Sequence, residues 1–288
     1  MSDMPGDPPF IRIGPDIPAS PVVISVPHAG RSYPPSLLRA SRLPLHKIET
    51  LEDRLVDRLV WRAVANGCSA LIANAARAEI DLNRDEREID PASVVPSLPL
   101  RSTLQSARTK GGLGLIPSRI PGAGAIWLHR IGQDEVRRRV EVIHRPYHEE
   151  LARCLGQARE RFGIAILLDC HSMPPRNMAA GDPGLVFGDR HGTSIAPELV
   201  DAAIQAARGA GFTAGRNNPY AGGYTTALHG RPHSGIHALQ LEVDRALYLD
   251  EALREPGPGF DRTSHLIAAV AAALAERAIG SGQAIAAE

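Results

Sequence analysis

The sequence predicts an α/β fold, in which helices pack on a β-sheet. Two apolar segments, 22–26 and 69–74, have the length and composition of buried strands. Between them, residues 47–66 repeat apolar side chains at helical spacing, and Gly67 follows as a stop signal. A strand, a helix and a second strand in this order form the repeating unit of α/β sheets. These three segments therefore define the expected fold class.

Further apolar segments extend this pattern towards the end of the chain. Residues 164–168 form the clearest buried strand, and Asp169 and His171 follow it closely. Residues 133–161 are expected to be helical, with a bend at Pro146, because a proline removes a backbone donor. The other expected elements are strands at 184–187 and 236–243 and helices at 195–210 and 262–280.

Two stretches between these elements are expected to be long loops. Residues 75–130 hold many charges followed by Pro and Gly, and residues 217–235 are rich in Gly, Pro and His. Loops this long in compact domains are usually functional. No internal repeat or low-complexity linker divides the sequence, so we expect one domain over residues 1–288, with a flexible or loosely packed N-terminus over 1–17.

The composition argues against several classes of function. The 32 basic and 32 acidic residues leave no basic excess of the kind that nucleic-acid-binding proteins or polybasic membrane anchors show. The three cysteines are widely separated, which argues against a disulfide framework and a cysteine-rich zinc site. Residues 1–17 do not resemble a signal peptide, and no run of about 18 apolar residues occurs. We therefore expect a cytoplasmic protein without nucleic-acid or membrane partners.

Several of the expected strands lead into ionisable residues. In open α/β sheets, ligands bind just beyond the carboxyl ends of the strands, so residues distant in sequence are expected to meet at one rim. An ordinary structural role competes with this interpretation, since a lone histidine after a strand is more often a capping or core residue. The ionisable residues at these strand ends are His28, Asp169, His171 and Glu242.

Two of these histidines and one carboxylate match the donor set of a catalytic metal site. Zn²⁺ held by His28, His171 and an acidic residue keeps a fourth position for water, lowers the pKa of that water and polarises a carbonyl. The candidate acids are Glu52 and Asp53, near the start of the expected helix 47–66. Acids in a first helical turn also stabilise the helix dipole, so spacing alone leaves this site open.

Seven short motifs follow one another along the chain. They are Pro27-His28-Ala29-Gly30, Glu52-Asp53 with Val56-Asp57, Asp81-Leu82-Asn83-Arg84, Leu168-Asp169-Cys170-His171-Ser172, Gly188-Asp189-Arg190-His191-Gly192, Asn218-Pro219-Tyr220-Ala221-Gly222-Gly223-Tyr224, and Ala238-Leu239-Gln240-Leu241-Glu242-Val243 with Arg245-Ala246-Leu247-Tyr248. Together they resemble the N-formylglutamate amidohydrolase family, over residues 21–252. The order of the motifs carries the resemblance, because no single motif is decisive.

The resemblance implies both a fold and a metal site. The family is similar in fold to zinc carboxypeptidases and aspartoacylases, which implies three layers, with a mixed, mainly parallel sheet between helices. It also implies one Zn²⁺ per chain, bound by His28, His171 and an acid of the Glu52-Asp53 pair. Another divalent metal stays an alternative.

The resemblance favours Asp53 over Glu52 as the acidic ligand. The family pattern places an aspartate four residues before the aspartate of a Val-Asp pair, which is Asp57 here. Glu52 stays an alternative. In the related aspartoacylase pattern the acidic ligand lies three residues after the first histidine. Arg31 occupies that position here, so the ligand has to come from further along the chain.

The resemblance also implies roles in amide hydrolysis. Glu242 matches a general base, which takes a proton from water and can pass it to the leaving nitrogen. Arg77 is expected to polarise the scissile carbonyl. Asn83 and Arg84 are expected to bind the substrate's carboxylate, because a guanidinium fits a carboxylate with two parallel bonds. The plainer interpretations are a surface-facing strand glutamate and a solvated run of charges, and we accept the latter only for 85–88.

The glycine-rich loop is expected to form a wall of the substrate site. Gly223 permits close backbone approach, and Tyr224 can donate to a substrate carboxylate. The roles of the four remaining histidines nearby stay open: His191, His229, His233 and His237.

These observations together predict a metal-dependent amidohydrolase with a small-molecule substrate. The leading reaction is hydrolysis of N-formyl-L-glutamate to formate and L-glutamate. One alternative is hydrolysis of another N-acyl amino acid or small amide on the same scaffold, and peptide cleavage of the carboxypeptidase type is a more distant one. A further alternative, from another class, is a non-catalytic protein that binds a metal or a carboxylate. The sequence does not predict an oligomeric state.

Overall fold

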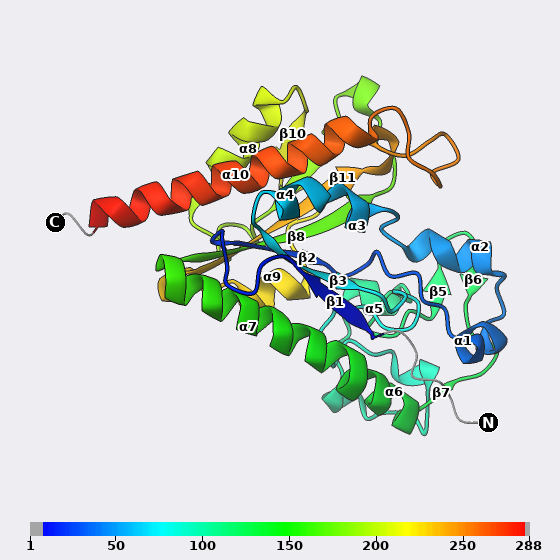
Figure 1. The fold of residues 1–288 in the computed structure, drawn as a ribbon. Helices are drawn as coiled ribbons and strands as arrows, with labels where there is room; N and C mark the ends of the chain where they lie inside the picture. Colours follow the sequence, from blue (N-terminus) through cyan, green and yellow to red (C-terminus); the bar gives the residue numbers. More distant parts are fainter. Residues whose placement is uncertain (1–7, 286–288) are drawn as a thin grey trace. The chain divides into compact units, whose positions relative to one another are not determined.

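A computed structural model describes residues 8–285 and contains a seven-stranded β-sheet (Figure 1). Its strands are β1 (Phe10–Ile13), β2 (Val22–Val26), β3 (Ser69–Ala73), β8 (Ala165–Met173), β9 (Leu185–Gly188), β10 (Ala214–Arg216) and β11 (Ile236–Asp244). They lie in the order β1-β3-β2-β8-β11-β9-β10. β3, β2, β8 and β11 are parallel neighbours, whereas β9 is antiparallel to β11 and parallel to β10. The sheet is thus mixed and mainly parallel, which confirms the predicted fold class.

The central strands are buried along their whole length. Every residue of β2, β3, β8 and β9 is buried. Continuous apolar strands of this kind are typical of parallel sheets that are covered on both faces. β8 continues five residues beyond the predicted end at 168. Asp169 and His171 therefore lie within the strand, in register with Gln240 and Glu242 of β11.

The described chain forms two compact units. The smaller unit holds residues up to 11, 27–52 and 73–149, and the larger unit holds 12–26, 53–72 and the residues from 150 onward. One domain over 1–288 remains a prediction. Of the predicted loose N-terminus, residues 1–7 lie outside the described residues, and Phe10–Ile13 form β1.

Helices cover both faces of the sheet in the larger unit (Figure 1). On one face, the long α10 packs against α8, α4 and α3, and on the other face α9 contacts β11 and β8. This helix–sheet–helix arrangement agrees with the predicted layers. The bounds of these helices are Val56–Leu59 (α3), Trp61–Ala65 (α4), Pro197–Gly209 (α8), Tyr224–His229 (α9) and Phe260–Ile285 (α10).

The predicted continuous helix over 47–66 was wrong. Helix α2 spans Leu45–Ile48, a 3₁₀ turn follows at Glu49–Leu51, and the backbone of Glu52 is extended before the chain turns into α3. Both Glu52 and Asp53 are buried. The break lets these two carboxylates reach polar partners in the interior, Tyr33 for Glu52 and His171 for Asp53.

The helix predicted over 133–161 changes its pattern just before Pro146, where a bend was expected. Helix α6 (Gln133–Arg139) and helix α7 (Arg145–Phe162) are joined by a π-helical turn, Val140–His144. Pro146 is the second residue of α7 and lies two residues after this turn. The irregularity therefore precedes the proline, and π-helical turns of this kind often occur at functional sites.

The segment 75–130 is a long excursion with only short elements, as predicted. In the smaller unit, a small apolar core lies beneath it, built around Ile48, Ile120 and Ile126. No helix within residues 8–285 is long and apolar enough to cross a membrane. The short elements of this unit are α1 (Pro35–Ala40), β4 (Val94–Val95), α5 (Ala107–Lys110), β5 (Arg119–Ile120), β6 (Gly124–Ala125) and β7 (Ile131–Gly132).

Candidate active site

His171 lies between two buried carboxylates in the larger unit. Its Nδ1 is 2.9 Å from Oδ2 of Asp53, and its Nε2 is 2.9 Å from Oδ2 of Asp169. Ser25 Oγ donates to the other oxygen of Asp169 at 2.7 Å. An imidazole with a carboxylate at each nitrogen has to carry a proton or a cation at both positions, since a carboxylate can only accept.

The electrostatics of this cluster call for a positive charge. Burial lowers the pKa of His171, but Asp169, Asp53 and Glu242 together raise it well above the ordinary histidine value. A metal ion held by His171 and Asp53 would meet the same demand, and the Nε2–H bond to Asp169 would fix the ring. This carboxylate–histidine–metal arrangement is the usual support of a metal-ligating histidine. The residues present therefore fit a bound metal ion.

The second oxygen of Asp53 is held by two further side chains. Arg245 Nη2 lies 3.3 Å from Oδ1 of Asp53, and Ser172 Oγ donates to the same oxygen at 3.2 Å. Arg245 Nε also donates to Ser172 Oγ at 3.0 Å. These bonds fix the carboxylate of Asp53 with Oδ2 towards His171. Sequence reasoning assigned no role to Ser172 or Arg245, although both lie within the quoted motifs.

Glu242 and Gln240 form a hydrogen-bonded pair on β11. Gln240 Nε2 donates to Oε1 of Glu242 at 2.8 Å, and the backbone N–H of Gly223 donates to Oε1 of Gln240 at 2.8 Å. Glu242 is in register with His171 on the neighbouring strand β8. The structure therefore brings three predicted site residues of the larger unit, Glu242, Gly223 and His171, into one neighbourhood. Tyr224 follows as the first residue of α9.

A second polar cluster, in the smaller unit, surrounds Asp81. His28 Nε2 lies 2.7 Å from one oxygen of Asp81, and Arg77 Nε donates to the other at 2.9 Å. Burial raises the pKa of Asp81, but Arg77, Arg84 and His28 together hold it well below the ordinary aspartate value. Asp81 is therefore a carboxylate that accepts an N–H from Nε2 of His28, so Nδ1 is the ring nitrogen that this contact does not use.

Arg84 has one buried nitrogen without a hydrogen bond. Its Nε donates to the carbonyl of Leu113 at 2.9 Å, and its Nη1 donates to that of Asn83 at 2.6 Å. Nη2 lies 3.8 Å from Asp81 and has no hydrogen-bond partner among residues 8–285. A buried N–H group without an acceptor is costly, so this atom is suited to a ligand that supplies one.

Two histidines that sequence reasoning missed hold the Asn83-Arg84 segment. His144 Nε2 lies 2.9 Å from the carbonyl oxygen of Arg84, and His148 Nε2 lies 2.9 Å from that of Leu82. Both are buried, and their rings lie 4.6 Å apart. Their spacing of four residues, on one face of a helix, was the available signal.

The four histidines left open divide into buried and exposed pairs. His229 is buried, and burial lowers its pKa to about 4. Burial also lowers the pKa of His237, whose Nδ1 accepts from the backbone N–H of Ala196 at 3.2 Å. His191 and His233 are exposed. His229 and His237 are therefore neutral rings near pH 7.

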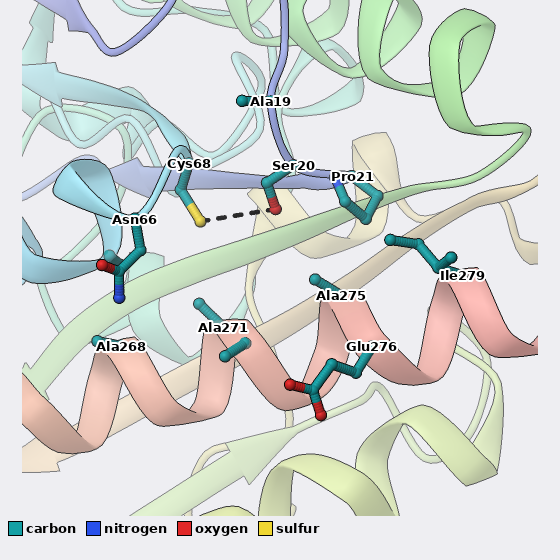
Figure 2. A pocket seen from close by; sticks show the side chains of 12 residues that line it. Ala19, Ser20, Pro21, Asn66, Cys68, Ala268, Ala271, Ala275, Glu276 and Ile279 are labelled. Carbon is teal, nitrogen blue, oxygen red and sulfur yellow. Dashed lines mark hydrogen bonds between the residues drawn. The ribbon is translucent and has the colours of Figure 1, made fainter.

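The larger unit also contains a pocket of about 230 Å³ that none of the predicted site residues line (Figure 2). Alanines of α10 form one wall, and Cys68 lies opposite, with its Sγ 3.8 Å from Ser20 Oγ. Burial raises the pKa of the Cys68 thiol, so it stays protonated and is a poor nucleophile. This pocket lacks the groups that hydrolysis needs.

Glu52 has a different partner from Asp53. In the smaller unit, Tyr33 Oη donates to Oε1 of Glu52 at 2.5 Å. The carboxylate of Glu52 thus accepts a hydrogen bond from the phenol of Tyr33, whereas Asp53 contacts the imidazole of His171.

Comparison with known proteins identifies a family for this chain. The family model described as N-formylglutamate amidohydrolase matches residues 20–249. Two curated relatives are named N-formylglutamate deformylase. The one from Pseudomonas putida is 30% identical, over 80% of this chain and 82% of the relative, and the one from Pseudomonas aeruginosa is 29% identical, over 80% and 83%.

Solved structures agree with this assignment. The crystal structure of N-formylglutamate amidohydrolase from Ralstonia eutropha JMP134 superposes with a TM-score of 0.83 at 31% identity, covering 97% of this chain and 99% of that one. A gene product of Agrobacterium tumefaciens shares the fold, with a TM-score of 0.63 at 16% identity, covering 97% and 95%. This chain belongs to the N-formylglutamate amidohydrolase family.

Proposed function

We propose that this protein hydrolyses the amide bond of N-formyl-L-glutamate, consuming one water and releasing formate and L-glutamate. The names of its relatives supply the substrate. The observation that carries the chemistry is the imidazole of His171, bonded at both nitrogens to the buried carboxylates of Asp53 and Asp169. That cluster is suited to a cation, and metal-assisted hydrolysis is the amide chemistry that such a site supports.

We propose His28, Asp53 and His171 as the metal ligands, a donor set that can hold a metal ion. Only Pro27 separates His28 from the end of β2, so its Cα lies within about 7 Å of that strand end. β2 and β8 are adjacent parallel strands, so their carboxyl ends share one edge of the sheet. Both histidines also have a carboxylate at Nε2, Asp81 and Asp169, which leaves Nδ1 of each for the metal.

Zn²⁺ is the proposed metal, and another divalent ion stays an alternative. Two imidazoles and one carboxylate with an open fourth position are the typical ligands of a catalytic zinc. When bound, the metal supplies the Lewis acidity that activates a water and polarises the substrate carbonyl. Asp53 is preferred over Glu52 because it contacts His171, whereas Glu52 accepts from Tyr33.

Glu242 is proposed as the general base. It accepts the proton of the attacking water and delivers it to the leaving nitrogen, which departs as the amino group of glutamate. Its position in register with His171 and its bond from Gln240 support this role, because both keep the carboxylate near the proposed metal ligand in a defined orientation.

The smaller unit is proposed to bind the substrate. Arg84 Nη2, which lacks a hydrogen bond among residues 8–285, is proposed to take a substrate carboxylate with help from Asn83. Arg77, whose Nε is anchored on Asp81, is proposed to polarise the scissile carbonyl. Gly223 and Tyr224 are proposed to line the substrate site.

A substrate panel tests this function against its alternatives. Hydrolysis rates are measured for the N-formyl, N-acetyl and N-carbamoyl derivatives of glutamate and for N-formylglutamine, alongside the metal content of the same preparation. The highest kcat/KM is expected for N-formylglutamate. Preference for another acyl group or amino acid would indicate a different hydrolase on the same scaffold. Metal binding without turnover of any of them would indicate a non-catalytic protein.

A further inference from the structure

The amide of Gln240 contacts Gly223 through its oxygen and Glu242 through its nitrogen, and each contact fixes the other. Its oxygen accepts from the backbone N–H of Gly223, and its nitrogen donates to Glu242, both at 2.8 Å. A backbone N–H can only donate, so the oxygen of Gln240 has to face Gly223. The NH₂ group then has to face Glu242, which accepts as a carboxylate. Both hydrogen bonds therefore run in the same direction, from Gly223 as donor through Gln240 to Glu242 as acceptor.

The loop that carries Gly223 is itself anchored on the end of β9. We define the glycine loop as residues 217–223. Asn217 Nδ2 donates to Oδ1 of Asp189 at 2.5 Å, and the backbone N–H of Arg190 donates to the carbonyl of Ala221 at 2.6 Å. The glycine loop is thus held to the residues that follow β9 at two points.

The glycine loop and β9 also approach each other closely. A β-carbon at Gly188 would lie 2.6 Å from the backbone nitrogen of Gly222, so only glycine fits at that position. Gly188 is in register with Gln240 on the neighbouring strand β11. The loop therefore rests on β9 directly beside Gln240, which brings the N–H of Gly223 to its amide.

We propose that Gln240 is a positioning residue that couples the glycine loop to the general base Glu242. The proposal rests on the proposed function, since it requires Glu242 to act as the base. Gly223 and Tyr224 are the residues of this region proposed to line the substrate site. A substrate that binds these two residues fixes the position of the Gly223 N–H. Through its two hydrogen bonds, Gln240 then fixes the orientation of the Glu242 carboxylate.

Two variants of Gln240 separate the two halves of this connection. Gln240→Met has a similar length and removes the hydrogen bonds to Gly223 and Glu242. Gln240→Glu keeps an oxygen for the N–H of Gly223 and, as a carboxylate, offers no N–H to Glu242. The matched control is Ser194→Ala, because Ser194 Oγ donates to the carbonyl of Ala238 on the same strand at 2.8 Å, four residues before Glu242. All variants are measured on N-formylglutamate in the zinc-loaded full-length protein.

Both Gln240 variants are expected to lower kcat about tenfold or more, with KM changed less than about twofold. Each is also combined with Glu242→Gln. In that background neither variant should lower the residual kcat further, because two residues that act through one group are not additive. Ser194→Ala should leave kcat within about twofold of the parent protein.

The proposal is overturned if the Gln240 variants lower kcat by the same factor with and without Glu242, or if Ser194→Ala is equally slow. Normal kcat in both Gln240 variants, with Glu242→Gln nearly inactive, would remove the role of Gln240 alone. Full activity of Glu242→Gln would instead overturn the proposed base, and the role of Gln240 with it.

Discussion

His171 and Asp169 lie two residues apart on β8 and are joined by a 2.9 Å contact between Nε2 and Oδ2. Alternate residues of a strand point to the same face of a sheet, so this strand carries both the proposed ligand and the carboxylate that orients it. The arrangement depends on two neighbouring side chains of a single buried strand. It is therefore as rigid as the sheet itself.

Asp169→Asn is expected to weaken metal binding without abolishing it. The amide keeps the shape of the side chain but no longer fixes the histidine tautomer, and such outer partners are typically worth about 10–100-fold in metal affinity. Competition with a chromogenic chelator measures the change. Asp182→Asn, at a more exposed ion pair with Arg176, serves as the control and should bind metal normally. Unchanged affinity in Asp169→Asn would remove its orienting role.

Arg84→Gln is expected to lower kcat/KM for N-formylglutamate by about 100-fold, as for loss of a buried charge pair. Steady-state kinetics with the substrate and its α-methyl ester check this role. On the parent protein, kcat/KM for the ester should be lower than for the free acid by a similar factor. On Arg84→Gln, the ester and the free acid should have similar kcat/KM values. Arg87→Gln, at an exposed neighbour that pairs with Asp85, is the control. A parent protein indifferent to the ester would contradict the assignment.

His148→Ala is expected to raise KM about three- to tenfold while kcat changes less than about twofold. The variant removes the bond to the carbonyl of Leu82 that supports the Asn83-Arg84 segment, and one such bond is typically worth about 1 kcal/mol. Steady-state kinetics separate the two constants, and His265→Ala, at an exposed histidine of α10, is the control. A fall in kcat at constant KM would show that His148 acts on chemistry instead.

Glu242→Gln is expected to lower kcat by about 10²–10⁴, the range typical of a general base. The variant keeps the shape of the side chain, so it should still hold one metal per chain and still bind glutamate. Metal analysis and product titration accompany the kinetics. Loss of metal would make Glu242 a ligand, and retained activity would direct the search for the base to Asp169 or His191.

Part of the sheet was predictable because its signals are local, whereas β1 and β10 were not expected as strands. β2 matched its expected range, and β3 and β11 matched to within one residue, since short runs rich in apolar residues need no distant partner to be recognised. The prediction of a helix over 47–66 was wrong because the spacing of apolar residues gives no information on the burial of Glu52 and Asp53 against polar groups. Tertiary contacts of two acids overrode a strong helical pattern there.

The candidate site was only partly predictable for the same reason. The proposed ligands carry recognisable side chains next to strands. His144 and His148 were missed because their partners are backbone carbonyls about 60 residues away, at Arg84 and Leu82. Gln240 was assigned no role because its contact with Gly223 arises only in the folded chain. A side chain that forms a hydrogen bond with a distant backbone group cannot be recognised from the pattern of a single sequence, because any residue can supply that backbone group.

The central claim, a single catalytic metal held by His28, Asp53 and His171, is tested most directly by titrating zinc into chelated protein. Turnover of N-formylglutamate is followed as zinc is added to the metal-free parent protein and to His171→Ala. We expect no turnover without metal, a linear recovery that ends at about one zinc per chain, and neither tight zinc binding nor recovery in His171→Ala. Full turnover by the metal-free protein, or normal recovery in His171→Ala, would contradict the account.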